Sequence, residues 1–363
     1  MAPETAQNAA ASSPFFEQFT AYPMEMTRPD GSAKYAFVTF LMMNDSYLAS
    51  ALMLAYGLRQ QQSGADTVCM VTKDVSDEAR RALGVLYDHV IDVDEFFVHH
   101  KSRRGRHDRP LWFTRLHCLR LGADGDLGFG YEKVCILDAD VYPLRHFDNL
   151  FTLRGPAGIL NEDKRHCLES DENGKFIYPD SIRTHGKWNW HARYEPLCKH
   201  GERIPRDITD RVATDVANLG LNGSLYVFDT SLDEFHDIER DVDRPEIKRY
   251  VGELFKWPDM QYLTMRYSGE WTNIDIKFSS FNGYPRLDLL CGCHYSGFKP
   301  WHFKKKSIGL YKGYEDFSFW YAQYFAMIQR DYPALKDFRT LENVARRIHR
   351  LLGDEPPPGA FAS

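Results

Sequence analysis

Residues 134–144 read VCILDADVYPL, an apolar run that ends in Asp138, Ala139 and Asp140. Residues i and i+2 of an extended chain point to the same face, so both carboxylates can reach one ion. Hard cations such as Mg²⁺ and Mn²⁺ prefer carboxylate oxygens and commonly join a protein to a diphosphate. The stretch therefore predicts a buried strand that ends in a divalent-metal site.

The sequence around this stretch alternates strand-like and helix-like patterns. Helical patterns at 46–61 and 76–88 separate four apolar runs, at 35–41, 67–72, 89–93 and 133–138. Such alternation predicts an α/β fold with a mostly parallel sheet, helices on both faces and ligands at the carboxyl ends of the strands. No G-x-G-x-x-G follows the first run and no P-loop sequence occurs, which argues against dehydrogenases and P-loop enzymes.

The D-x-D spacing occurs four times in the chain, at Asp92/Asp94, Asp124/Asp126, Asp138/Asp140 and Asp241/Asp243. The second pair lies in a Gly-rich turn and the fourth in a charged helical stretch, where a solvated face is the simpler interpretation. The first pair follows a short apolar run, but no metal-suited cluster surrounds it. Spacing alone therefore does not single out the third pair.

A second segment, CGCHYSGFKPW at 291–301, offers partners for that pair. Two aspartates and His294 form a mixed oxygen and nitrogen ligand set that suits Mn²⁺. Gly297 allows a close approach of backbone to phosphate, and Lys299 provides a point charge for it. The alternative is that His294 is a hydrogen-bonded histidine beside the sheet.

Four blocks follow one another in the chain: AFVTFLMMNDSYLASALMLAYGLRQ (36–60), FTRLHCLRL (113–121), VCILDADVYPLRHFDNLF (134–151) joined to LNGSLYVFDTS (221–231), and HYSGFKPW (294–301). In this order they resemble the family 8 glycosyltransferases, specifically the glycogenin and galactinol synthase branch, including members that large DNA viruses encode. Ordered blocks are more specific than any single motif. The resemblance implies one Rossmann-like, GT-A type nucleotide-sugar-binding domain over residues 34–303.

The resemblance implies a contact with a UDP-sugar for each matching residue. The implied ligands of Mn²⁺, or of Mg²⁺ as the alternative ion, are Asp138, Asp140 and His294, with Ala139 between the acids as a further donor contact. Gly297 and Lys299 match the phosphate contacts. The uracil and ribose contacts match Thr39, Asn44 and Tyr47, in a loop one residue longer than that of glycogenin.

At the sugar end of the implied site, the chain departs from the family in three places. Asn222 and Gly223 match the region that touches the donor sugar, although here Gly directly follows Asn. Asp259 matches the acid of an Asp-Gln pair near the anomeric carbon, and Met260 replaces the Gln. Arg115 stands where the family usually has a Lys, so a planar fork replaces a point charge.

The implied reaction transfers glucose or galactose, with retention, from a UDP-sugar to an acceptor that the sequence leaves open: a sugar, polyol, glycan or protein. Cations aimed at the leaving diphosphate stabilise the transition state, and Lys299 and Arg115 would share that role with the metal. Retention needs a protein nucleophile or a front-face attack. We favour the front-face route, in which the catalytic groups are Asp259, Asn222 and Arg115.

Two other classes of function stay open at this point. One is a catalytically weak nucleotide-sugar-binding protein, which the Met260 departure favours. The other is a different metal-dependent nucleotide enzyme, such as a nucleotidyltransferase. Turnover of UDP-sugars supports the glycosyltransferase, and UDP binding without turnover supports the binding protein. Turnover of nucleoside triphosphates supports the nucleotidyltransferase.

Composition and net charge limit the possible fold size and binding partners of the chain. With 363 residues, 43% of them hydrophobic, the chain can bury a large core. The net charge of −6 argues against a nucleic-acid binder. The basic runs at 99–109 and 302–306 are local. The simpler interpretation is that they are solvated loops. The alternative is that they cover the diphosphate, with Arg109 contributing to the cover.

Cysteines and targeting signals indicate the compartment. The seven cysteines include no C-x-x-C pair, as for reduced structural thiols, and the gap between Cys291 and Cys293 does not match zinc spacing. Sequons at Asn44 and Asn222 fall on implied donor contacts, so secretion would place glycans in the site. Without a signal pattern or a run of 18 apolar residues, we expect a cytoplasmic protein with no transmembrane segment.

Four segments are expected to flank or interrupt the core. Residues 1–33 and 354–363 are predicted to be a disordered leader and tail. The insertion at 152–220 is expected to help form the acceptor pocket, with Trp188 and Trp190 as sugar-stacking platforms or, alternatively, as buried residues. Residues 304–353 are predicted to be a helical extension that packs on the domain or forms a homodimer contact.

Overall fold

The computed structural model describes residues 24–101, 106–167, 187–281, 287–303, 312 and 314–353. Residues 24–33 differ from the predicted disordered leader, because Thr27 pairs with Ala33 and Met26 O accepts a 2.8 Å hydrogen bond from Lys34 N. The remainder of the predicted leader, and the predicted tail at 354–363, lie outside the described residues.

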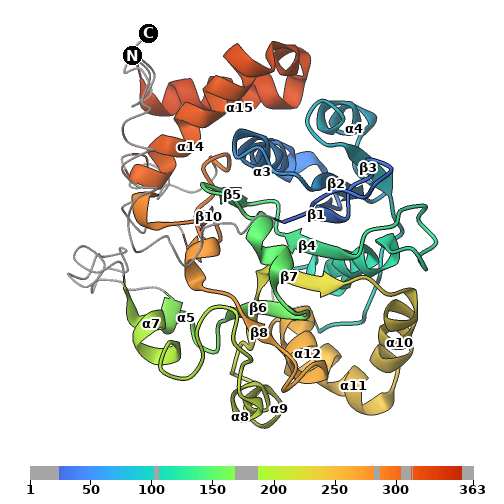
Figure 1. The fold of residues 1–363 in the computed structure, drawn as a ribbon. Helices are drawn as coiled ribbons and strands as arrows, with labels where there is room; N and C mark the ends of the chain where they lie inside the picture. The colour runs from blue at the N-terminus through green and yellow to red at the C-terminus, as the bar shows by residue number, and fades with distance from the viewer. Residues whose placement is uncertain are drawn as a thin grey trace.

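A seven-stranded sheet of order β3-β2-β1-β4-β7-β6-β8 forms the centre of the molecule (Figure 1). Its strands are β1 (Tyr35–Leu41), β2 (Asp66–Val71), β3 (His89–Asp92), β4 (Lys133–Leu137), β6 (Ala157–Leu160), β7 (Leu221–Asp229) and β8 (Thr272–Asn273). Strand β7 runs antiparallel to both neighbours, and the other pairs are parallel. The predicted α/β fold with a mostly parallel sheet is confirmed.

The first four strands match the predicted apolar runs to within one residue at each end. In β2 every residue after the first is buried, as expected for a strand covered on both faces. Helices α3 (Leu48–Gln60) and α4 (Asp77–Leu83) lie between these strands in sequence. The Ser76 side chain caps α4 by accepting a hydrogen bond from Ala79 N.

A small sheet of order β5-β10-β9 joins the aspartate motif to the distant histidine. Its strands are β5 (Val141–Pro143), β10 (Gly292–His294) and β9 (Ser280–Phe281). In the antiparallel β5–β10 pair, His294 lies opposite Val141, which directly follows Asp140. Gly292 makes the close packing here possible, because a Cβ at that position would lie 2.4 Å from Phe278 O. Strand pairing therefore places His294 beside the aspartates.

The block before β4 forms a 3₁₀ helix, η2 (Arg109–Leu121), where the resemblance implies an ordinary helix. A 3₁₀ helix has three residues per turn, so residues i and i+3 lie one above the other. Trp112 and Arg115 are related in this way, and both line the same cavity. Trp112 and Arg115 therefore lie on the side of η2 that faces the cavity.

The C-terminal segment folds back over α3 (Figure 1). It consists of α14 (Glu315–Ala326), the π-helical turn η7 (Met327–Asp331), η8 (Pro333–Asp337) and α15 (Arg339–Leu352). In α15, Leu341 and Ile348 are buried, and Val344 and Leu351 pack against the core. These contacts support core packing for this helix, and the homodimer contact stays a prediction.

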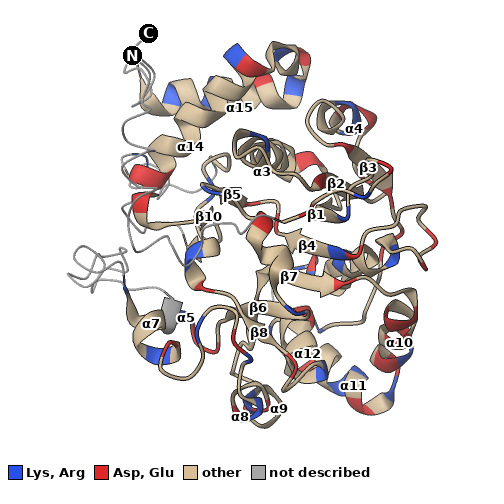
Figure 2. Cartoon of the chain, in the orientation of Figure 1, with Lys and Arg blue, Asp and Glu red and all other residues tan. Residues whose placement is uncertain are grey.

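The remaining helices lie around the sheet and its loops: η1 (Asp45–Tyr47), η3 (Asp148–Thr152), α5 (Lys164–Cys167), α7 (Asn189–Tyr194), α8 (Arg206–Thr209), α9 (Arg211–Thr214), α10 (Leu232–Val242), α11 (Pro245–Arg249), the π-helical η4 (Tyr250–Leu254), α12 (Pro258–Arg266), η5 (Ile276–Phe278) and η6 (Leu287–Leu289). Charged residues gather on outer helices such as α10 and α15, and the central strands are mostly uncharged (Figure 2). The charge pattern thus places the hydrophobic core at the sheet.

The segment expected to be an insertion, 152–220, contains a strand of the central sheet. Strand β6 pairs with both β7 and β8. Trp188 and Trp190 are only 2% and 1% exposed, and Trp190 Nε1 donates a 2.8 Å hydrogen bond to Leu160 O. The prediction that these two indoles stack on an acceptor sugar is therefore wrong, because their faces are taken up by the core.

A buried contact between a histidine and a carboxylate fastens α7 to the rest of the domain. His191 Nε2 lies 3.1 Å from Asp275 Oδ1, and Asp275 also accepts a hydrogen bond from Lys277 N. Burial opposes ionisation of Asp275, but His191 and Lys277 hold its pKa below the ordinary aspartate value. Burial also lowers the pKa of the Lys277 ammonium to about 8.

The Asp275→Asn variant should lose roughly 3–5 kcal/mol of unfolding free energy at pH 7, because it removes the carboxylate that His191 contacts and that offsets the buried Lys277 ammonium. A carboxylate with a depressed pKa stabilises the fold above its ordinary pKa and loses that effect as the pH falls. Urea denaturation should therefore show a difference between variant and parent that shrinks below the ordinary aspartate value of 3.8. A pH-independent difference would contradict this explanation.

Candidate active site

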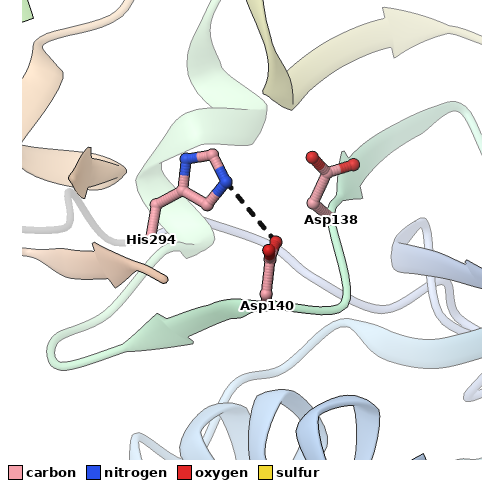
Figure 3. A group of neighbouring side chains, drawn as sticks. All are labelled: Asp138, Asp140 and His294. Atoms are coloured by element: carbon pink, nitrogen blue, oxygen red, sulfur yellow. Dashed lines mark ion pairs between the residues drawn. The ribbon is translucent and has the colours of Figure 1, made fainter. Parts of the chain in front are cut away.

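Asp138, Asp140 and His294 meet at the carboxyl end of β4 (Figure 3). Asp138 directly follows β4, and its backbone N–H donates a 2.9 Å hydrogen bond to Ser224 O of β7. His294 Nε2 lies 3.4 Å from Asp140 Oδ1. Asp140 and His294 are buried, and Asp138 is half-buried. The three predicted ligands therefore form one cluster at the sheet edge where ligands are expected.

The cluster fits a single divalent cation. One ligand atom from each residue lies within 4.8 Å of the others. Ligands that share an ion at roughly 2.0–2.3 Å are separated by at most about twice that distance. His294 Nδ1 is buried and accepts or donates no hydrogen bond among the described residues. Two carboxylates and an imidazole are suited to Mn²⁺, so the residues present fit the implied metal.

Lys299 is the nearest cation to this cluster. Its ammonium donates a hydrogen bond to Asp140 Oδ2 and another, of 2.6 Å, to Tyr295 O. Burial by itself raises the pKa of Asp140, but Lys299 and His294 outweigh burial and hold it below the ordinary aspartate value. Asp140 is therefore ionised and ready to bind a cation at neutral pH.

Arg115 lies between the candidate metal cluster and Asp259, the acid that is expected near the donor sugar. Its Nη2 lies 3.1 Å from Asp138 Oδ1 and its Nε lies 3.2 Å from Asp259 Oδ2. Its Nη1 donates to Gly223 O. Its Nε also donates a 3.3 Å hydrogen bond to Trp112 O. The three nitrogens of the guanidinium thus contact four groups, a geometry that a lysine ammonium does not reproduce.

The carboxyl pKa values of the two acids that flank Arg115, Asp138 and Asp259, shift in the opposite direction to that of Asp140. Burial raises the pKa of Asp259 and also that of Asp138, and Arg115 opposes both shifts. The negative charge of Asp140 adds to the rise for Asp138. A single buried guanidinium therefore supports the ionised form of two carboxylates.

A cavity of about 670 Å³ contains this cluster. A volume of that size is in the usual range for small-molecule sites. It is lined by twelve residues that the sequence predicts for the site: Asn44, Tyr47, Arg115, Asp138, Ala139, Asp140, Asn222, Gly223, Asp259, His294, Gly297 and Lys299. The structure thus brings nearly all of the predicted site residues together.

Two predicted contacts, Thr39 and Arg109, do not line the cavity. The Thr39 hydroxyl is buried and donates a 2.8 Å hydrogen bond to Leu137 O, so it ties β1 to β4. The Arg109 guanidinium lies 5.4 Å from the ring centroid of Trp257. Arg106, three residues earlier, lines the cavity in its place.

The part of the cavity wall where the nucleotide is expected carries several apolar side chains. Leu41, Met42 and Met43 line it beside Tyr47, and Met43 has a positive φ of 69°. A positive φ is uncommon outside glycine and marks a constrained turn.

The part of the cavity wall where the donor sugar is expected combines one amide with a thioether. Asn222 Oδ1 accepts a 3.1 Å hydrogen bond from Ser224 N, and its buried Nδ2 donates to no described residue. Both Asn222 and Met260 line the cavity. A Cβ on Gly223 would lie 2.9 Å from Met260 Cγ, so the glycine keeps the thioether close to the strand. The replacement of Gln by Met thus removes a hydrogen-bonding group from the cavity wall.

The other three D-x-D pairs make ordinary surface contacts. Asp92 pairs with Arg80 and Asp126 with Arg120. Asp243 pairs with Lys248 over 2.9 Å and is largely exposed. In the described part of the chain, only the group with Asp138, Asp140 and His294 has three side chains placed to hold a metal.

The described cysteines are structural. Cys69, Cys118, Cys135, Cys198, Cys291 and Cys293 are all buried and free. Burial raises the pKa of the Cys291 thiol to about 12. Among the described residues, no helix has the length and apolar character needed to cross a membrane.

Comparison with known proteins gives the chain its relatives. No protein-family model matches it. An uncharacterised protein of Acanthamoeba polyphaga mimivirus is 28% identical over 319 residues, which span 84% of this chain and 95% of the viral protein. Galactinol synthase 6 of Arabidopsis thaliana is 22% identical over 290 residues, or 77% of this chain and 76% of the synthase.

Glycogenin-1 of Oryctolagus cuniculus is 31% identical over 155 residues, which are 42% of this chain and 43% of glycogenin. The match thus covers less than half of that relative. A crystal structure of the galactosyltransferase LgtC with donor and acceptor sugar analogs is 15% identical, with a TM-score of 0.49, and covers 78% of this chain and 94% of LgtC. The chain is a homologue of the glycogenins and galactinol synthases of glycosyltransferase family 8, which confirms the family that its ordered blocks predict.

Proposed function

We propose that the protein is a metal-dependent, retaining glycosyltransferase that moves a hexose, glucose or galactose, from a UDP-sugar to an acceptor. The observation that carries this proposal is the cluster of Asp138, Asp140 and His294 in one cavity with Lys299 and Arg115. The homology to glycogenin and galactinol synthase supports it. The preferred ion is Mn²⁺, because a nitrogen ligand joins two carboxylates.

The donor diphosphate belongs beside the metal cluster. Lys299 and Arg115 are the fixed cations there, and fixed cations aimed at a developing negative charge lower the barrier to breaking the sugar–phosphate bond. A bound Mn²⁺ would add Lewis-acid stabilisation of the same leaving group. Gly297, which lines the cavity next to Lys299, is the position where backbone approaches the phosphates.

The donor sugar belongs beside Asn222 and Asp259. The buried Asn222 Nδ2 can donate to a sugar hydroxyl, which would satisfy its hydrogen-bonding capacity. Asp259 is held by Arg115 and completely buried, so we assign it the orientation of sugar hydroxyls in a front-face reaction. Trapping a glycosyl adduct on Asp259 would overturn the front-face route.

Incubation with UDP-glucose or UDP-galactose and Mn²⁺ should release UDP. EDTA should lower the rate at least about 100-fold, since metal stabilisation is worth several kcal/mol of barrier. UDP binding without any turnover would favour a nucleotide-sugar-binding protein, for which Met260 is the motivating observation. Release of pyrophosphate from nucleoside triphosphates would indicate a nucleotidyltransferase.

We also propose a reducing compartment, most simply the cytoplasm. The described cysteines are free and buried, and the sequon residues Asn44 and Asn222 both line the cavity. Glycans at these positions would block donor binding.

A further inference from the structure

The part of the cavity beyond the donor contacts has aromatic walls. Trp112 and Trp257 stack with ring centroids 5.4 Å apart and planes 10° apart, and both line the cavity. Phe281 also lines it, and its ring centroid is 5.3 Å from that of His294. Aromatic side chains therefore line the cavity both beside His294 and at the indole pair.

Two cationic side chains border this aromatic wall. The Lys164 ammonium lies 5.2 Å from the Trp257 centroid and 5.9 Å from the Phe281 centroid. The Arg106 guanidinium lies 5.2 Å from Trp257 and 5.3 Å from Trp112. Distances below about 6 Å are within the range of cation–π attraction. N–H donors are thus held over the indole rings.

Trp257 is held in place by Gln261, which is completely buried. Gln261 Oε1 accepts hydrogen bonds of 2.8 Å from the backbone N–H groups of Lys256 and Trp257. Its Nε2 donates to Val216 O and Asn218 O over 3.0 and 2.8 Å. The side chain uses all four of its hydrogen-bonding positions, so the turn that carries Trp257 is rigid before any ligand binds.

The same turn carries the acid of the proposed site. Trp257 is the N-cap residue of α12, and Asp259 is two residues further along in its first turn. Both line the cavity. A molecule on the indole is therefore next to the place where the donor sugar reacts.

We propose that Trp257, backed by Trp112, is the platform on which a saccharide acceptor stacks. A sugar ring has an apolar C–H face and a rim of hydroxyls, which complement an indole face bordered by Arg106 and Lys164. This inference rests on the proposed transfer. In that reaction the acceptor oxygen bonds to the anomeric carbon, the bond to UDP breaks, and the hydroxyl proton passes to the departing phosphate.

Saturation-transfer NMR on the full chain with UDP and Mn²⁺ tests the platform directly. The probes are glucose, galactose, lactose, maltotriose and inositol. At least one should bind the parent protein, and Trp257→Ala should weaken that binding at least about tenfold. Trp257→Phe keeps an aromatic face and should retain most of it.

Phe97 provides the matched control, because it is an aromatic residue that is 63% exposed and does not line the cavity. Phe97→Ala should bind the probes as the parent does. The platform is overturned if no probe binds, if Trp257→Ala binds like the parent, or if Phe97→Ala loses as much. Calorimetric titration with UDP separates the two levels: intact UDP binding without saccharide binding refutes only the acceptor platform, whereas absent UDP binding in the parent refutes the proposed function.

Discussion

The Asp140→Asn variant is expected to bind UDP at least about 100-fold more weakly in Mn²⁺ than the parent, because even partners that only support metal ligands contribute about 10–100-fold. Asp140 is the acid that pairs with both Lys299 and His294. Its loss removes a predicted metal ligand and leaves the buried Lys299 ammonium without its carboxylate. Isothermal titration with UDP, with Mn²⁺ and with EDTA, measures the effect.

His294→Ala should reproduce this loss, because the aspartates and the imidazole are predicted to hold the same ion. The matched control is Asp243→Asn, which changes an acid of a look-alike D-x-D pair that is 75% exposed. The control should keep metal-dependent UDP binding. If Asp140→Asn retains affinity to within about tenfold while remaining folded by circular dichroism, the metal assignment is wrong.

The three residues of the candidate metal site could be predicted because they follow from a local sequence pattern and from the order of the matching blocks. An apolar run that ends in two acids specifies a strand end, and the order of the blocks specifies which histidine pairs with it. The register of β5 and β10, which places His294 opposite Val141, is a consequence of sheet pairing that the sequence does not spell out. The prediction of these ligands rested on the family's order, not on spacing.

The misplaced contacts have a common physical cause, which is the direction of a side chain within its element. Thr39 lies in the right strand, but its hydroxyl turns to Leu137 O. Arg109 lies in the right basic run, yet Arg106 reaches the cavity. Which side chain of a strand or loop reaches the cavity depends on local backbone winding and packing, and the composition of the segment does not determine either.

The tryptophans also show that the sequence does not reveal which way a side chain faces. Trp188 and Trp190 stand out in a polar, irregular segment, and the chain buries them against the sheet. Trp257 has no distinctive sequence context, and it reaches the cavity because α12 begins there and Gln261 fixes the turn. Only tertiary packing distinguishes a buried indole from one that faces a ligand.

The Arg115→Met variant should show the largest combined loss of stability and activity. It leaves the half-buried Asp138 and the buried Asp259 without their shared cation, which costs roughly 3–5 kcal/mol of unfolding free energy. Loss of one fixed donor at the leaving group should lower turnover by about 10²–10³-fold. Arg115→Lys should lower the turnover about 10–100-fold, because one charged hydrogen bond is worth roughly 1.5–3 kcal/mol.

A double variant separates the two effects of Arg115. Arg115→Met combined with Asp259→Asn removes one of the uncompensated charges, so urea denaturation should show more stability than for Arg115→Met alone. Its UDP-sugar turnover should stay as low, because neither the cation nor the acid is restored. If turnover recovers together with stability, Arg115 acts only by supporting the fold. The reference is Asp259→Asn alone, which lacks the same acid: turnover of the double variant well below that of Asp259→Asn indicates that the guanidinium, which lies between Asp138 and Gly223, acts on the donor itself.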